Sequence, residues 1–111
     1  MDRLEHYRQC LQQFLRNYAA YGAQREGLET QVIVDTMNDH YLLFRTGWDK
    51  NKRIHACIFH FDIKGDKIWV QENNTDLEID HDLEAMGISK QDLVIGFHHP
   101  SMRECSDYAI A

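Results

Sequence analysis

Histidine is the residue type in this sequence with the most potential for chemistry, since seven of the 111 residues are histidines. Imidazole nitrogens bind transition metals and serve as general bases near neutral pH. His55 and His60 lie five residues apart, so strict alternation along a strand would place them on opposite faces. His98 and His99 are adjacent and would likewise diverge in an extended chain.

Neither histidine pair has the spacing, two residues on a strand or four on a helix, that brings two imidazoles to one metal. We therefore expect no metal site and no other cofactor. A site assembled from distant segments, for example His40, His60 and His98, remains an alternative.

Nucleophilic catalysis has no recognisable motif in this chain. There is no Gly-x-Ser-x-Gly elbow, and the six glycines are too dispersed for a phosphate-binding loop. The three cysteines, Cys10, Cys57 and Cys105, are odd in number and scattered, which fits a reducing cytoplasm. We expect a non-catalytic, cytoplasmic protein. The alternative is a small histidine-dependent hydrolase or metal enzyme with His98 or His99 as its base.

The net charge of −6 is unevenly distributed. Residues 1–64 contain nine Lys/Arg and eight Asp/Glu, whereas residues 65–111 contain three and ten. Affinity for nucleic acid depends mainly on Lys and Arg, so an acidic chain begins at a disadvantage. We therefore do not expect the chain to bind nucleic acid directly. A direct DNA-binding module is kept as the second alternative function. No stretch reaches the roughly 18 apolar residues that cross a bilayer, so we expect no membrane partner.

The elements that would position these side chains follow from periodicity. Apolar residues at three- and four-residue steps predict a helix over 3–21, with Gly22 as its stop. Alternating runs separated by short turns predict strands at 29–36, 39–48, 53–63 and 67–72. Connections this short cannot carry a parallel crossover, so the strands should form an antiparallel meander.

The third of these strands is apolar on both faces. One face should take the first helix, and the other should be covered by the second helix, the tail or another molecule. Self-association or partner binding is therefore expected more than for an average domain of this size.

A second helix is predicted after the sheet. Thr75 and Glu78 have the spacing of a capping box, Ile79, Leu83 and Met86 supply an apolar face, and Gly87 ends the helix. Asp76, Glu78 and Asp82 form its solvated side or a partner contact. Ser89 could cap one further turn, and residues 93–95 are either a short extra strand or buried irregular chain.

The tail contains the only proline of the chain, Pro100. Proline biases His99 away from helical conformation. One interpretation is a rigid corner that seats Phe97 in the core. The other is a presented loop in which His98, His99, Pro100 and Arg103 contact a partner.

In combination, these segments closely resemble the XisI family, the fdxN-element excision controlling factors of cyanobacteria. The central match includes Asp39, His40, Tyr41, Gly47, Trp48 and His55; the later matches include Trp69, Gln71, Thr75, Phe97, His98, Pro100 and Arg103. The chain departs from the family pattern at Leu42, where a glutamine is common. The resemblance implies an accessory factor for excision of a DNA element, with a XisH-like partner of nuclease fold.

Together these observations predict one XisI-like domain over residues 1–111 with an α+β fold. It would comprise an N-terminal helix, a four-stranded antiparallel meander, a short C-terminal helix and an ordered tail. The expected function is control of excision through protein contacts, and a homo-oligomer is a further candidate assembly.

Overall fold

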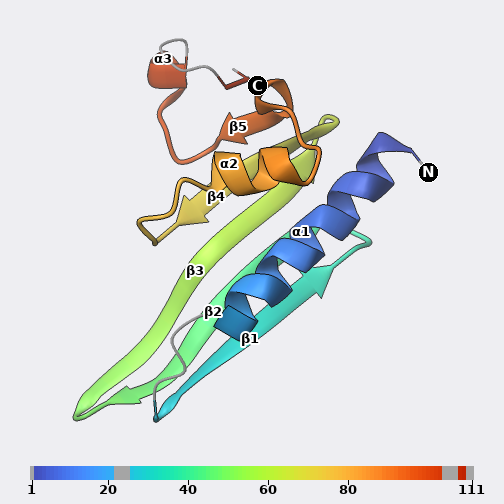
Figure 1. Ribbon diagram of the computed structural model, residues 1–111. Coiled ribbons are helices and arrows are strands. Elements are labelled where there is room, and N and C mark those ends of the chain that lie inside the picture. Colours follow the sequence, from blue (N-terminus) through green and yellow to red (C-terminus); the bar gives the residue numbers. More distant parts are fainter. Residues whose placement is uncertain (1, 22–25, 104–107, 110–111) are drawn as a thin grey trace.

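A long helix and a short one pack against a five-stranded sheet (Figure 1). The computed structural model describes residues 2–21, 26–103 and 108–109. The elements in chain order are α1 (Arg3–Tyr21), β1 (Leu28–Asp35), β2 (His40–Asp49), β3 (Lys52–Lys64), β4 (Lys67–Asn73), α2 (Ile79–Ala85), a 3-10 turn (Lys90–Asp92), β5 (Leu93–Ile95) and α3 (Pro100–Arg103). None of the described helices is long and apolar enough to cross a membrane.

Helix α1 begins and extends as its sequence predicts. The carboxylate of Asp2 accepts a hydrogen bond from the Glu5 amide at 2.7 Å, which satisfies one of the free N–H groups of the first turn. Its buried stripe consists of Tyr7, Cys10, Leu11, Phe14 and Leu15. The predicted stop at Gly22 lies outside the described residues.

The sheet has the order β1-β2-β3-β4-β5. The first four strands form the predicted antiparallel meander, but a sheet of only four antiparallel strands is wrong because β5 joins β4 in parallel. The segment through α2 is long enough for the crossover that parallel pairing requires. Leu93–Ile95 pair with residues 68–70 of β4, which resolves the ambiguity at 93–95 in favour of a strand, and all three are buried.

Both longer helices, α1 and α2, lie over the same face of the sheet (Figure 1). Phe59 of β3 meets the rings of Phe14 and Tyr18 at centroid distances of 5.2 and 5.0 Å. Among the described residues, neither of these helices lies on the opposite face. We call that side the open face; it carries Ile33, Leu42, Phe44, Trp48, His55 and His60.

A β-bulge in β3 decides which side chains reach the open face. Leu43 pairs with Phe59 and Phe44 pairs with Cys57, so Ile58 is the extra residue. The bulge shifts the alternation by one, and residues directly opposite each other share a face. His55 pairs with Thr46 and His60 with Leu42, so both histidines lie on the open face. Their predicted separation onto opposite faces is wrong.

The predicted capping box of α2 is also wrong. The helix begins at Ile79, and Glu78 caps it without a side-chain hydrogen bond. The hydroxyl of Thr75 instead accepts from the Leu77 amide at 3.1 Å and donates to Asn73 at 2.6 Å, forming a turn that precedes the helix. The side chain therefore stabilises a local alternative to helical structure.

The end of α2 agrees with the sequence. Gly87 has a φ of 97°, which favours glycine, and its amide donates to the Glu84 carbonyl at 2.9 Å. The Ser89 hydroxyl accepts from the Gln91 amide at 3.1 Å and caps the next turn, as predicted.

Candidate functional site

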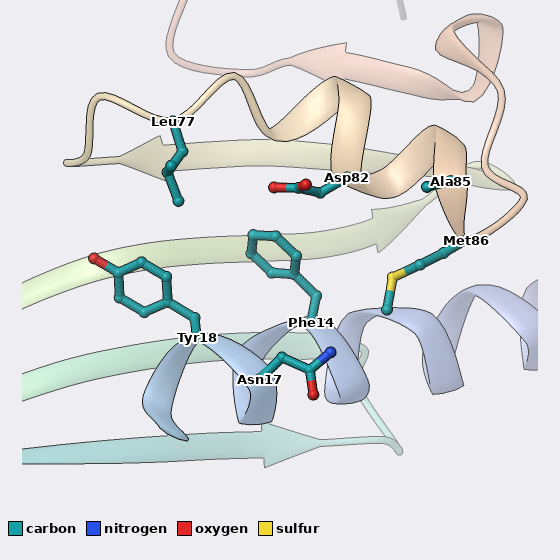
Figure 2. A pocket seen from close by; sticks show the side chains of 7 residues that line it. All are labelled: Phe14, Asn17, Tyr18, Leu77, Asp82, Ala85 and Met86. Carbon is teal, nitrogen blue, oxygen red and sulfur yellow. The ribbon is translucent and has the colours of Figure 1, made fainter. Parts of the chain in front are cut away.

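A groove of about 360 Å³ runs between α1 and the chain leading into α2 (Figure 2). Its lining residues are Phe14, Asn17, Tyr18, Leu77, Asp82, Ala85 and Met86. Phe14 and Tyr18 come from α1, and Asp82, Ala85 and Met86 come from α2 or its end. Leu77 is 44% exposed, so the groove presents apolar surface to solvent.

One acidic residue, Asp82, lines the groove. Asp76 and Glu78 are the sequence neighbours of the lining residue Leu77, and Glu78 lines the smaller cavity described below; Asp76, Glu78 and Asp82 are all exposed. Lys90 contacts Asp80 and Glu84 at 3.8 and 3.9 Å. Because Asp80 and Glu84 are four residues apart on one side of α2, Lys90 lies away from Asp82. Asp76, Glu78 and Asp82 were the predicted partner contacts of the second helix.

A smaller cavity of about 200 Å³ brings the second helix and the tail together. Glu78, Phe97 and His98 all line it. The predicted corner that seats Phe97 in the core is wrong, because its side chain is 52% exposed. The ring centroids of Phe97 and His98 lie 4.9 Å apart, with the two rings nearly perpendicular.

The rest of the predicted tail contact divides into exposed and anchored residues. His98, His99 and Pro100 are exposed. His99 Nδ1 accepts from the Ser101 amide at 3.2 Å, at the start of α3. Arg103 is half-buried, with its guanidinium 5.1 Å from the centre of the Trp69 ring and a hydrogen bond to the Gly96 carbonyl at 3.4 Å.

Two of the family-motif residues, Asp39 and Tyr41, have a structural role at the β1–β2 turn. Asp39 accepts from Arg8 of α1 and from the Tyr41 hydroxyl, at 2.8 and 2.9 Å. The hydrogen bond from Arg8 lowers the pKa of Asp39, despite partial burial. Burial and the same carboxylate raise the pKa of Tyr41, which is completely buried.

Gly47 and Trp48, also in the motif, lie where β2 approaches the start of β1. Gly47 has a φ of 143°, and a Cβ there would lie 2.0 Å from the Gly27 carbonyl oxygen. The Trp48 amide donates to that same oxygen at 3.0 Å. The Trp48 side chain is 54% exposed, and the guanidinium carbon of Arg53 lies 5.5 Å from the centre of its ring. His55 is exposed beside Phe44, with ring centroids 5.5 Å apart.

A second candidate site lies on the open face, where His40 and His60 converge on Asp62. Asp62 Oδ1 lies 2.6 Å from His40 Nδ1 and 2.9 Å from His60 Nε2. Burial raises the pKa of Asp62, but hydrogen bonds from the two imidazoles outweigh it and leave that pKa below its ordinary value. The hydrogen bond to Asp62 raises the pKa of His40.

Sequence reasoning found only part of this cluster. His40 and His60 do meet, but His98 lines the cavity near α2 instead, and the third member is Asp62. The missed signal is the two-residue spacing of His60 and Asp62, which places both side chains on one face of β3. Gln71 was also missed as a neighbour; its Nε2 donates to Asp62 Oδ2 at 3.3 Å.

A family model and two solved structures match nearly the whole chain. The family model described as XisI protein matches residues 1–110. A crystal structure of a XisI-like protein from Anabaena variabilis is 38% identical with a TM-score of 0.92, covering 98% of this chain and 100% of that one. The crystal structure of the fdxN element excision controlling factor XisI from the same organism is 35% identical with a TM-score of 0.86, covering 99% and 100%. Among curated proteins, none matches the chain.

Proposed function

The chain belongs to the XisI family, and from this premise we propose that it controls the programmed excision of a DNA element without catalysing the reaction. It does so by binding a XisH-like protein of nuclease fold. The support for an excision role is the likeness, over the full chain, to a protein described as the fdxN element excision controlling factor.

The groove between α1 and α2 is the observation that supports action through a protein partner; we call it the acidic groove. Its apolar lining, with Phe14, Tyr18 and Leu77, offers surface whose burial favours association. Asp82 in its lining, and Asp76 and Glu78 on either side of Leu77 in the sequence, offer negative charge. A basic segment with an apolar anchor residue complements both features.

This chemistry identifies the class of occupant. A protein that cuts or joins DNA presents Lys and Arg to phosphates, and the same basic surface is attracted to the acidic groove. The groove would repel the phosphates of DNA itself. The controlling factor would therefore act on the DNA-processing protein and not on the element.

The binding test uses the purified chain and a purified XisH-like protein from the same genome, measured by biolayer interferometry at two salt concentrations. Asp82→Lys should weaken binding about tenfold or more and flatten its salt dependence, because it reverses a charge in the groove lining. Leu77→Ser should weaken binding at both salt concentrations, because it removes an apolar contact. Both residues are exposed, so neither change should unfold the chain.

The matched control is Glu29→Lys, which makes the same charge change at an exposed position of the edge strand β1. It should bind as the unchanged chain does. Equal affinity for all four proteins would contradict the groove as the contact surface.

The cellular test measures excision by amplification across the rejoined DNA junction, in a strain from which the gene has been deleted. The unchanged gene and Glu29→Lys should restore excision, and Asp82→Lys should not. Full restoration by every variant, together with salt-dependent retention of DNA by the isolated chain, would favour the direct DNA-binding alternative.

A further inference from the structure

We propose that His40, His60 and Asp62 bind one divalent transition-metal ion, of the zinc class, on the open face of the sheet. The three side chains come from β2 and β3, where His40 pairs directly with Asp62. This site is separate from the acidic groove, which lies on the opposite side of the sheet. It departs from the expectation that the histidine spacing allows no metal.

The donor atoms are already gathered. One nitrogen of each histidine and one carboxylate oxygen all lie within 4.8 Å of one another. In a tetrahedral zinc site, with ligand distances of about 2.0–2.2 Å, neighbouring donor atoms are about 3.3 Å apart. The present separations of 2.6 and 2.9 Å from Asp62 Oδ1 would have to open by about 0.7 and 0.4 Å to reach that spacing. Rotation of the two partly exposed imidazole rings supplies that movement.

The buried member of the cluster is a carboxylate. Asp62 is 8% exposed and is the buried charged residue of the described chain. A buried carboxylate needs a cation or several donors to offset its lost hydration. Two imidazoles supply donors without metal, and an ion between the three side chains would supply positive charge directly.

Strand register and a β-bulge assemble the site. The β2–β3 register places His40 opposite Asp62 and Leu42 opposite His60, so the three ligands share the open face. The bulge places Gln71 as the extra residue of β4, because His60 pairs with Glu72 and Phe61 with Val70. Gln71 then reaches the second oxygen of Asp62 and fixes the orientation of the carboxylate. Bulges re-aim side chains next to functional sites, and an outer hydrogen bond of this kind orients a metal ligand.

The ligand set indicates the class of ion. Two imidazoles and one carboxylate suit zinc and its neighbours, whereas magnesium and calcium prefer oxygen ligands. Three protein ligands leave a fourth position open to water or to a side chain of another molecule. His40 and His60 have side chains 49% and 31% exposed, so an ion reaches the site from solvent.

A second group of potential ligands, Glu78, Asp80 and His81, serves as an internal comparison. Glu78 and His81 are exposed, and the group lies at the start of α2. Exposed acidic residues at a helix start are stabilised by the helix dipole alone and require no ion. We assign no metal to it.

The test uses the purified chain, stripped with a chelator and titrated with zinc alone by isothermal calorimetry. Cobalt is then added to a second sample, and its visible absorption reports the coordination geometry. The unchanged chain should bind one ion per molecule. His40→Gln and His60→Gln should each weaken binding by about tenfold or more, and Gln71→Ala should weaken it less.

The matched controls are His55→Gln, on the same face but outside the cluster, and His81→Gln, in the comparison group. Both should bind zinc like the unchanged chain, and circular dichroism should show every variant folded. The proposal is overturned if the double variant His40→Gln/His60→Gln keeps the affinity and cobalt spectrum. The proposal is also overturned if His81→Gln loses zinc binding while His40→Gln and His60→Gln keep it.

Discussion

Arg8 of α1 and Asp39 of the β1–β2 turn are joined by two hydrogen bonds, from Nε to Oδ1 at 2.8 Å and from Nη2 to Oδ2 at 3.3 Å. The guanidinium and the carboxylate therefore meet side by side, in the geometry that arginine favours. Asp39 has a φ of 59°, a conformation that aspartate tolerates better than most residues. The pair ties the first helix to the sheet.

Two substitutions of Asp39 should distinguish its hydrogen bonds with Arg8 from its tolerance of a positive φ. Asp39→Ala should lower the free energy of unfolding by about 2–3 kcal/mol, because it removes charged hydrogen bonds and strains the turn. Asp39→Asn should cost less, because asparagine tolerates the same φ and retains an acceptor oxygen. Urea unfolding of the three proteins measures both values. Equal losses for the two variants would contradict the importance of the turn conformation.

Gly47 should be intolerant of any side chain. Gly47→Ala should cost more than about 3 kcal/mol, since the strained φ alone costs roughly 1–3 and the added Cβ would meet the Gly27 carbonyl. Gly65→Ala is the control, because it carries only the strain of a left-handed residue (φ 55°) while its Cβ meets nothing within 4 Å. Thermal unfolding should show a much smaller loss for Gly65→Ala. Similar losses at both glycines would contradict the close approach at Gly47.

The two faces of the sheet should respond differently to loss of an aromatic ring. Phe59→Ala should cost about 3–5 kcal/mol because the ring is fully buried under α1. Phe44→Ala should cost clearly less, because that ring is only half-buried on the open face. Denaturant unfolding compares the two variants directly. An equal cost would indicate that the open face is covered.

Tyr7 should make stability depend on alkaline pH. Burial, followed by the hydrogen bond to Asp92, raises the pKa of Tyr7 to about 12. The unfolded chain loses this proton near pH 10, so the stability linked to the group is complete below about pH 10 and disappears as the pH rises through about 12.

The expected alkaline loss from Tyr7 is about 2–3 kcal/mol, since each pKa unit corresponds to about 1.4 kcal/mol. Tyr7→Phe lacks the ionisable hydroxyl and should lose less stability between pH 9 and 12. Urea unfolding at a series of pH values gives the comparison. Parallel curves for Tyr7→Phe and the unchanged chain would show that the tyrosine does not carry this dependence.

Helix α1 and strands β1–β4 were predictable within one or two residues because their signals are local. Apolar side chains recur at helical or strand spacing, and short turns force consecutive strands to pair antiparallel. The start of α2 was not predictable from Thr75 and Glu78, because the same Thr75 hydroxyl stabilises a turn with Asn73 and Leu77 instead. Two local arrangements compete there, and packing of Ile79 and Leu83 decides where the helix begins.

The sequence by itself determined the family, the helix, the four-stranded meander and the acidic side chains beside Leu77, since each depends on residue order over short spans. Only the tertiary structure decided that β5 pairs with β4, that α1 and α2 share one face, and that Phe97 is exposed. It also decided that His40, His60 and Asp62 meet. The reason is that these relationships depend on how distant segments pair and pack, which local spacing does not encode; His40 meets Asp62 only because β2 and β3 pair in this register.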